Sequence, residues 1–283
     1  LLAPKESLRW NVKDLLARLE MGCHAESKNK AMESLALLMD EDDKNVLVVA
    51  KEGGVQALVH MLNASGGPMA ANLRDKALSA VHRLSQLESC EKLLVSEGAL
   101  APLVRALEPG SSPHAKEKAA SALGNLTSRP ENVRAVFVHG GVPALLEICR
   151  SGTPAARSAA SGVIRNLACS SSSEFRRALV DEGALPVLVG LVKSGTPLAQ
   201  ERACEAIQHL CSADAADEPI RQAAVREGAA AALLAYYDNV QSPKGKEAAM
   251  GALANLASSS ASAAAAANNV EHLLAAGLVP RLV

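Results

Sequence analysis

The chain has 283 residues, of which 49% are hydrophobic and 2% aromatic, and its formal net charge is −1. This charge excludes an overall electrostatic attraction to nucleic acid or to an anionic membrane surface, so any recognition by charge has to be local. Because aromatic residues are so scarce, the core has to consist of Leu, Val, Ile and Ala, which suits closely packed helices.

A glycine at a helix end recurs about every 43 residues along the chain. The glycines of this series are Gly53, Gly98, Gly140, Gly183, Gly228 and Gly277. A fixed period in this range is typical of a solenoid, in which no unit buries its apolar face alone and stacked neighbours make the core. We therefore expect a repeat array and no self-contained active site.

The array is expected to begin with residues 1–41, a leading helix and an incomplete first repeat, because the segment 15–20 is similar to 103–108 of a later unit. Five full repeats are predicted to follow, at 42–86, 88–128, 130–170, 172–212 and 217–258. Residues 262–283 are predicted to open a truncated final repeat. Because the chain starts at Leu1 and stops inside that unit, we expect it to be part of a longer protein.

The repeat 88–128 illustrates the predicted helices. A short first helix ends at Gly98, since glycine is best able to adopt a left-handed cap, and a second helix follows from about residue 100 to 108. Ser112 is a good N-cap and Pro113 suits the first turn of a third, longest helix that ends near Thr127. The same break followed by proline recurs at Gly67-Pro68, Thr153-Pro154, Thr196-Pro197 and Ser242-Pro243.

Three helices in about 42 residues, the first short and the third long, resemble the armadillo repeat. Two-helix repeats have a shorter period, and HEAT repeats lack the short glycine-terminated first helix. The resemblance implies an all-α, right-handed superhelical solenoid whose third helices line a concave groove. Its helix joints and the Asn-Leu-Ala/Thr-Ser ends of its third helices also resemble plant and fungal armadillo scaffolds, including the yeast vacuolar protein.

The third helices align without gaps, and three register positions fall together on one side of them. The first is always alanine: Ala31, Ala77, Ala119, Ala160, Ala203 and Ala249. The others are Leu35, Val81, Leu123, Ile164, Ile207 and Leu253, and Leu38, Leu84, Leu126, Leu167, Leu210 and Leu256. We expect this side to be buried, with alanine where neighbouring helices approach closely.

The opposite side of the third helices carries a reference position and the positions four and seven residues before it. The reference residues are Leu37, Arg83, Asn125, Asn166, His209 and Asn255. In armadillo proteins an asparagine at this position hydrogen-bonds the main chain of an extended peptide, so the resemblance assigns that role to Asn125, Asn166 and Asn255. Arg83 and His209 depart from the pattern, and Leu37 cannot fill the role.

The resemblance thus predicts a peptide groove lined by Lys76, Arg83, Lys118, Asn125, Asn166, Arg202, His209 and Asn255. Its cations Lys76, Arg83 and Lys118 favour an acidic or phosphorylated segment, as groove lysines do in β-catenin. Importin-α instead pairs the asparagine with a tryptophan one turn earlier, and the only tryptophan here, Trp10, lies in the leading helix as a core or cap residue. A nuclear-import receptor is therefore disfavoured.

Catalytic and metal-binding patterns are not recognised in the sequence. The six cysteines form no dense disulfide framework, and without a recognisable signal peptide or transmembrane segment we expect a reducing cytoplasmic or nuclear setting. Cys204 and Cys211 share one side of a helix while His209 faces the other way, which argues against a zinc site. We expect buried free thiols, no metal, no cofactor and no enzymatic activity.

The function predicted is a non-catalytic protein-interaction scaffold that binds an extended peptide segment of a partner protein. Two alternatives keep the fold: the substrate-recognition region of a larger ubiquitin ligase, since plant armadillo arrays often accompany a U-box, and an organelle-membrane tether with an acylated amino terminus. The sequence favours no nucleic acid as partner.

Overall fold

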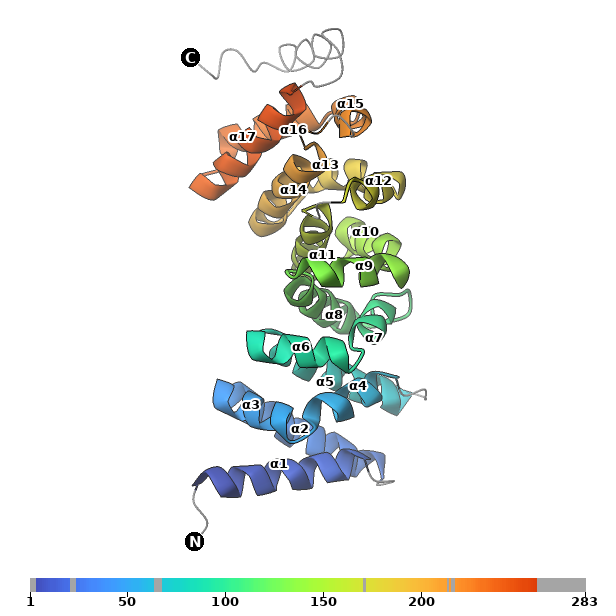
Figure 1. The fold of residues 1–283 in the computed structure, drawn as a ribbon, viewed down its shortest axis with the longest axis vertical. Helices are drawn as coiled ribbons and strands as arrows, with labels where there is room; N and C mark the ends of the chain where they lie inside the picture. The colour runs from blue at the N-terminus through green and yellow to red at the C-terminus, as the bar shows by residue number, and fades with distance from the viewer. Residues whose placement is uncertain are drawn as a thin grey trace. The chain divides into compact units, whose positions relative to one another are not determined.

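The computed structural model describes residues 4–20, 24–63, 68–169, 172–212, 214 and 217–258. Across these residues the regular elements are helices (Figure 1), and none of them is both long and apolar enough to cross a membrane. The chain divides into two compact units, Leu1–Gly141 and Val142–Val283. The predicted final repeat, 262–283, lies outside the described residues, as do Gly277 and Cys23.

Unit 1 begins with two long helices and continues as a succession of short and long ones. Its helices are α1 (Pro4–Glu20), α2 (Ala25–Glu41), α3 (Asp43–Lys51), α4 (Gly54–Asn63), α5 (Pro68–Ser85), α6 (Glu88–Ser96), α7 (Leu100–Arg105), α8 (Pro113–Leu126) and α9 (Pro130–Val138). The third helices α2, α5 and α8 pack against one another in that order. A solenoid core made of neighbouring layers is the result.

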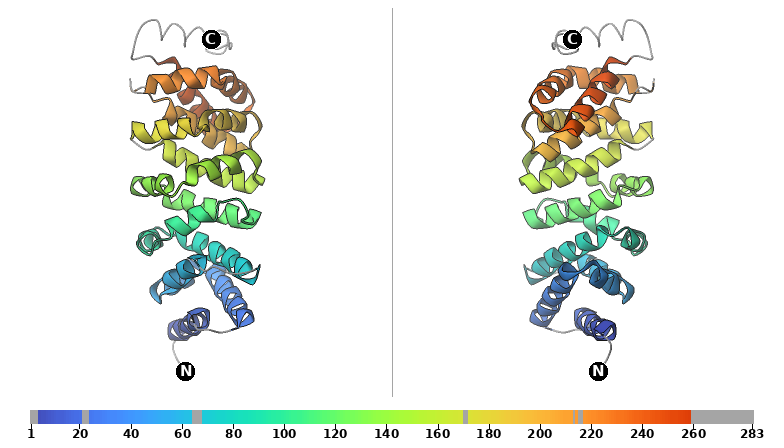
Figure 2. Two further views of the ribbon diagram at one scale, coloured as in Figure 1. Left: turned by 90° about the vertical axis from the view of Figure 1, so that its right-hand side faces the viewer. Right: turned by 90° about the vertical axis from the view of Figure 1, so that its left-hand side faces the viewer.

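Unit 2 repeats the same order of helices. They are α10 (Gly141–Ser151), α11 (Pro154–Ala168), α12 (Ser173–Asp181), α13 (Ala184–Ser194), α14 (Pro197–Leu210), α15 (Glu218–Arg226), α16 (Ala229–Asn239) and α17 (Pro243–Ala257). The third helices α11, α14 and α17 pack in succession, and Figure 2 shows the layers within each unit from two sides. Three helices per repeat is therefore the organisation of both units.

The predicted starts of the third helices are confirmed. The Ser112 hydroxyl accepts a hydrogen bond from the main-chain amide of Ala115 at 3.0 Å, and Pro113 occupies the first turn. Thr153, Thr196 and Ser242 cap α11, α14 and α17 in the same way. Each cap satisfies an amide that the helix itself leaves unpaired, so the recurring hydroxyl-proline pair is explained by helix initiation.

The glycine of each joint adopts the conformation expected of it. Gly98 has φ of +77° and Gly183 has φ of +84°, values that side chains with a Cβ rarely tolerate. Gly53, Gly140 and Gly228 share this left-handed backbone. The glycine series therefore marks the turn between first and second helices throughout the described repeats.

The predicted buried side of the third helices is confirmed with one exception. The register alanines and the two apolar positions beside them are buried in every third helix from α5 to α17. In α2, however, Leu38 is only half-buried. This helix belongs to the incomplete first repeat.

Four charged side chains are buried together in unit 2, which the sequence reasoning missed. Arg176 on α12 donates from Nε and Nη2 to Oδ2 of Asp217, at 2.9 and 2.6 Å. Beside them Arg221 on α15 donates from Nη2 to Oε2 of Glu218 at 2.6 Å. All four residues are at most 5% exposed. Because buried charges need partners, the contact between Arg176 and Asp217 fixes the first helix of one repeat to the start of the first helix of the next.

Unit 1 carries the same contact with the charges exchanged. Glu91 lies seven residues before Gly98, as Arg176 does before Gly183, and Arg129 lies eleven before Gly140, as Asp217 does before Gly228. Arg129 Nε donates to Oε2 of Glu91 at 2.5 Å. This pair of register positions therefore holds an acidic and a basic residue in either order.

Candidate functional site

The candidate site is the set of third-helix residues at the reference position and the positions four and seven before it, which we call the ladder. In unit 1 the ladder runs over α2, α5 and α8, and in unit 2 over α11, α14 and α17. The residues predicted for the site are all half-buried: Lys76, Arg83, Lys118 and Asn125 in unit 1, and Asn166, Arg202, His209 and Asn255 in unit 2. Leu37, at the same register in α2, is 67% exposed.

In unit 1 the ladder asparagine is tied to the preceding repeat. Asn125 on α8 donates from Nδ2 to the Ser85 hydroxyl at 3.0 Å, and that hydroxyl donates to the main-chain oxygen of His82 at 2.7 Å. The amide of Asn125 is therefore oriented by the end of α5.

Unit 2 ties its last ladder asparagine in a similar way. Asn255 on α17 donates from Nδ2 to the main-chain oxygen of Gln208 on α14, at 2.8 Å. An asparagine amide has two N–H donors and one carbonyl acceptor, and this tie uses one donor. Among the described residues, Asn125 and Asn255 each keep the Oδ1 acceptor and a second N–H, which match the N–H and C=O of a peptide bond.

These ties correct one expectation. Because the sequence places Asn125 and Asn166 opposite the packed face of the third helices, it predicts that replacing both by alanine leaves folding nearly intact. Because Asn125 and Asn255 each hold a hydrogen bond between repeats, we expect replacement by alanine to cost about 0.5–1.5 kcal/mol per site.

The three cations predicted for unit 1 are paired with carboxylates. Lys76 Nζ lies 2.6 Å from Oε1 of Glu33, and Arg83 Nη2 lies 2.6 Å from Oδ1 of Asp43. Lys118 Nζ lies 3.4 Å from Oε1 of its neighbour Glu117. The carboxylates of Glu33 and Asp43 are more exposed than the cations they pair with. An acidic ligand would therefore have to compete with these carboxylates.

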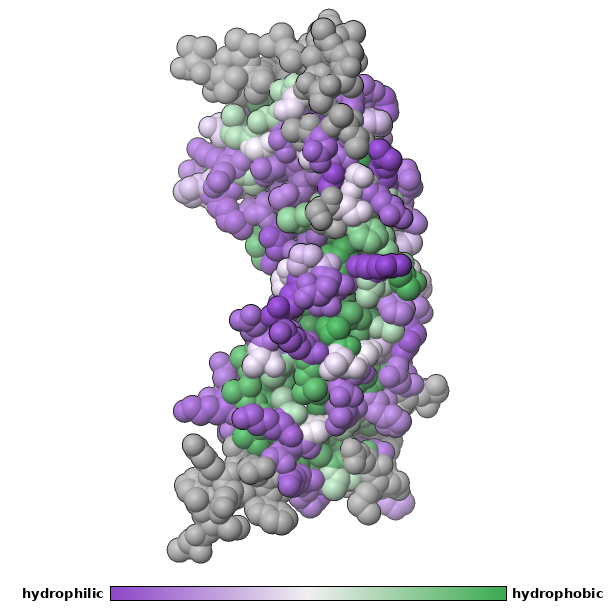
Figure 3. All heavy atoms as spheres, viewed as in Figure 1, coloured by the Kyte–Doolittle hydropathy of each residue, from purple (hydrophilic) through white to green (hydrophobic). Residues whose placement is uncertain are grey.

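The centre of the unit 2 ladder is a carboxylate that the sequence reasoning did not single out. Glu205 on α14 lies 3.0 Å from Lys244 Nζ of α17 and 3.5 Å from Arg165 Nη1 of α11. It therefore connects three successive third helices of this unit. Over α12 to α17 the face visible in Figure 3 is mainly hydrophilic.

Glycines in the ladder make room for long side chains of a neighbouring repeat. A Cβ on Gly162 would lie 3.0 Å from Arg202 Nη1, and Arg202 reaches past this glycine to donate to the main-chain oxygen of Ser158. A Cβ on Gly251 would lie 2.4 Å from Gln208 Nε2. The sequence shows glycine in α11 and α17 and long residues in α14 between them. It does not show that the long side chains of α14 pack over these glycines.

The pKa values of His209 in the ladder and of His82, the residue before Arg83, are both lowered, which favours the neutral imidazole. Burial lowers the pKa of His209, and burial together with the Lys118 charge lowers the pKa of His82. A neutral imidazole offers both a donor and an acceptor, so His209 adds polar capacity to the ladder rather than charge.

The thiols are buried where the structure describes them, except one. Burial raises the pKa of Cys149, Cys204 and Cys211 to about 12, and Cys90 is buried as well. The prediction of buried free thiols is confirmed at these four positions, whereas Cys169 is exposed.

This difference in burial makes a testable prediction about alkylation. When the native chain is treated briefly with iodoacetamide and mapped by mass spectrometry, we expect label on Cys169. The four buried thiols should react only after unfolding, because the reactive thiolate is inaccessible and disfavoured there. Equal labelling of all five in the native state would contradict the described burial.

Comparison with known proteins identifies the repeats. The Armadillo/beta-catenin-like repeat family matches residues 88–128, 129–169 and 172–212. These segments are armadillo repeats. The solved armadillo repeat structures similar to the chain include a designed armadillo repeat protein in complex with the peptide (KR)4, with a TM-score of 0.72 and 20% identity over 87% of this chain and 99% of the designed one.

A second solved structure and one natural relative complete the comparison. Computationally designed armadillo repeat proteins for modular peptide recognition match with a TM-score of 0.76 and 19% identity, over 86% of this chain and 99% of theirs. U-box domain-containing protein 43 of Arabidopsis thaliana is 30% identical over 132 residues, 46% of this chain and 16% of that protein. The fold is an all-α armadillo-repeat solenoid, a fold typical of protein-binding scaffolds and generally non-catalytic.

Proposed function

We propose that the ladder binds the main chain of an extended peptide segment of a partner protein, and that the chain acts as a non-catalytic scaffold. The observation that carries this proposal is the geometry of Asn125 and Asn255. Each is held in place by one bond to the preceding repeat and keeps an acceptor and a donor for a peptide bond. Two designed armadillo proteins of this fold support the proposal further. One is in complex with a peptide, and the other was designed for modular peptide recognition.

We further propose that the unit 1 ladder selects a phosphorylated segment over one that is merely acidic. A ligand has to displace Glu33 from Lys76 or Asp43 from Arg83, and each of those pairs is short. A phosphate carries nearly two charges and three strong acceptor oxygens, so it competes with a carboxylate better than another carboxylate does. Lys118, with its longer contact to Glu117, is the cation most readily released.

The test is an affinity pull-down from native extract with the intact chain and with the triple variant Asn125→Ala/Asn166→Ala/Lys118→Glu. We expect partners to be lost with the variant. Arg134→Glu serves as the matched control, because this exposed arginine lies on α9 and outside the ladder. Circular dichroism must show that both variants remain folded. Partners that bind the triple variant and the intact chain equally would move the binding surface elsewhere.

A second candidate is the substrate-recognition region of a ubiquitin ligase. The observation in its favour is the match to the plant U-box protein, of which the chain covers 16%. In that case the same ladder would hold the substrate while another domain performs the transfer. The sequence of the transcript upstream of Leu1 decides it: a U-box there supports this candidate, and a continuous transcript without one overturns it.

A further inference from the structure

A cleft of unit 2 that lies outside the ladder is lined by two arginines. Arg150 at the end of α10 and Arg157 near the start of α11 line it together with residues of α13. The cleft has a volume of about 320 Å³, at the lower end of the range for ligand-binding clefts. None of the described residues that line it carries a carboxylate, so the lining is cationic.

Arg157 is held at this cleft by its own repeat. Its Nε donates to the main-chain oxygen of Cys149 at 3.0 Å, close to the end of α10, where main-chain carbonyls lack partners within the helix. Within the described part of the chain, its Nη1 and Nη2 have no hydrogen-bond or ion-pair partner. One N–H group therefore fixes the guanidinium, and four stay available to a ligand.

The next repeat shows that this bond does not require a charge. Gln200 occupies the position of Arg157, seventeen residues after the glycine of the joint. It donates from Nε2 to the main-chain oxygen of Val192 at 2.9 Å. Because a neutral amide makes the same contact, the charge of Arg157 is not explained by packing within the repeat.

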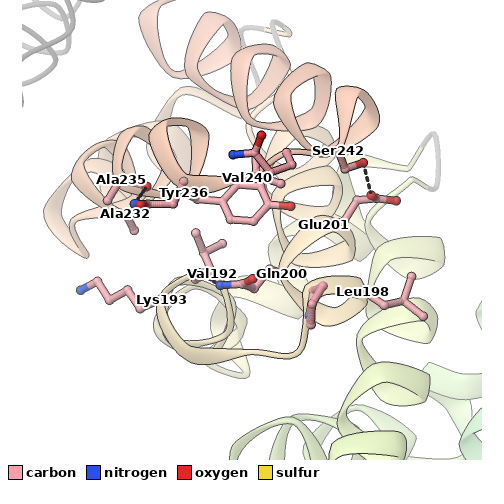
Figure 4. Close-up of a pocket in the computed structure, with 13 residues that line it drawn as sticks. Val192, Lys193, Leu198, Gln200, Glu201, Ala232, Ala235, Tyr236, Val240 and Ser242 are labelled. Atoms are coloured by element: carbon pink, nitrogen blue, oxygen red, sulfur yellow. Dashed lines mark hydrogen bonds between the residues drawn. The ribbon is translucent and has the colours of Figure 1, made fainter.

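Equivalent clefts at two other repeats combine cations with acids. The cleft in Figure 4, of about 800 Å³, is lined by Lys193 and Glu201, and the Glu201 carboxylate accepts a hydrogen bond from the Ser242 hydroxyl at 3.4 Å. The unit 1 cleft, of about 520 Å³, is lined by two arginines and two acids: Arg74, Arg105, Asp75 and Glu108. A lining with cations and no acid is therefore not a consequence of repeat architecture.

Arg150 is only weakly engaged within the protein. Its Nη1 lies 3.7 Å from Oε2 of Glu147, and the two side chains are 50% and 60% exposed, so the pair contributes little to stability. The other oxygen of Glu147 accepts a hydrogen bond from the Ser151 hydroxyl at 2.8 Å. Burial raises the pKa of the Cys149 thiol, and the charges of Arg157 and Arg150 oppose this effect. Both guanidinium groups therefore act on the same wall of the cleft.

A glycine in the middle of α13 leaves this cleft open. Gly190 belongs to the lining, and a Cβ at this position would meet no atom within 4 Å. Glycine inside a helix is destabilising relative to alanine, and the packing around this position does not require it. Ala235 lines the cleft of Figure 4 at the same register. A backbone without a side chain, beside two arginines, suits the close approach of a ligand.

We propose that this cleft binds a phosphate monoester, whose oxygens accept hydrogen bonds from Arg150 and Arg157 and whose ester stem lies over Gly190. Arginines on two helices offer forked donors in more than one direction. A phosphate carries nearly two charges and three strong acceptor oxygens, so it can bind both arginines, whereas one fork occupies both oxygens of a carboxylate. The site is distinct from the ladder and does not depend on its function.

The probe for this proposal is phenyl phosphate, titrated into the intact chain labelled with ¹⁵N at about 150 mM salt, which screens attraction between exposed charges. We expect amide shifts clustered at Arg157, Gly190 and Ser194. Phenyl sulfate, which has a similar shape and one charge, should bind about fivefold to tenfold more weakly. Arg157→Gln should weaken the binding of phenyl phosphate about tenfold to hundredfold and leave folding intact, since glutamine keeps the bond to α10 in the next repeat.

The matched control is Arg226→Gln, the same change at an exposed arginine of unit 2 outside the cleft lining, and it should leave the affinity unchanged. Gly190→Ala should weaken binding and raise the melting temperature, a combination that a packing role does not produce. Equal affinities for Arg157→Gln and Arg226→Gln, or for phenyl phosphate and phenyl sulfate, would overturn the proposal. An unchanged affinity in Gly190→Ala would overturn the placement over α13.

Two further probes distinguish the sources of such a group. A seven-residue glycine–serine peptide with one central phosphoserine represents a partner protein, and glycerol 2-phosphate represents a small molecule. The probe that binds more tightly and shifts the cleft amides assigns the source and supports the site. Cleft shifts with neither probe would overturn it.

Discussion

Replacing Arg176 by alanine should lower the free energy of unfolding by about 3–5 kcal/mol, because it leaves Asp217 as a buried charge without its main partner. Asp217 is 0% exposed, and among the described residues its Oδ1 has no hydrogen-bond partner. The measurement is urea denaturation followed by circular dichroism. Arg177→Ala, at the exposed neighbouring position, is the control and should cost well under half as much.

A charge exchange sharpens this test. The contact between Glu91 and Arg129 shows that the acidic residue can stand on the first helix of one repeat and the basic residue at the start of the first helix of the next repeat. The double variant Arg176→Glu/Asp217→Arg should therefore recover part of the stability lost in Arg176→Ala. If Arg176→Ala costs no more than Arg177→Ala, the buried pair does not hold the two repeats together.

The second large effect is expected from Leu167→Asp, which places a carboxylate on the buried side of α11. Leu167 is 0% exposed, so the change removes apolar contacts and buries a charge with no designed partner. We expect a loss of about 4 kcal/mol or more, visible as loss of helical signal at low urea concentrations.

Two controls separate the faces of the third helix. Asn166→Ala, at the adjacent ladder position, should cost far less than Leu167→Asp. Leu37→Asp makes the same chemical change at an exposed ladder position and should alter stability by only about 0.5 kcal/mol. A collapse of the Leu37 variant, or a stable Leu167 variant, would mean that the two faces have been exchanged.

The features predicted correctly from sequence are those that depend on neighbours along the chain. Ser112 and Gly98 mark helix ends because capping is decided within a few residues, and the register alanines mark the buried side because a helix has a fixed period. The family resemblance added the identity of the repeat, which the family match at 88–212 then confirmed.

The features that were missed depend on distances between repeats. Arg176 and Asp217 are 41 residues apart, and nothing near either residue shows that the other reaches it. The same holds for the tie from Asn125 to Ser85, 40 residues away. A signal was nevertheless present, since aligning the repeats on their glycines places Glu91 and Arg176 at one register and Arg129 and Asp217 at another. Opposite charges at paired registers predict the contact.

Site-specific photo-crosslinking shows whether a partner lies on the ladder. A photoreactive amino acid is placed at Ser121 in the unit 1 ladder, at Ala159 in the unit 2 ladder, or at Val138, an exposed residue of the first helix α9. Each protein is mixed with a partner purified through the intact chain and illuminated. We predict crosslinks to one extended segment of the partner from the ladder positions and none from Val138. Crosslinks from Val138 alone would contradict the proposal.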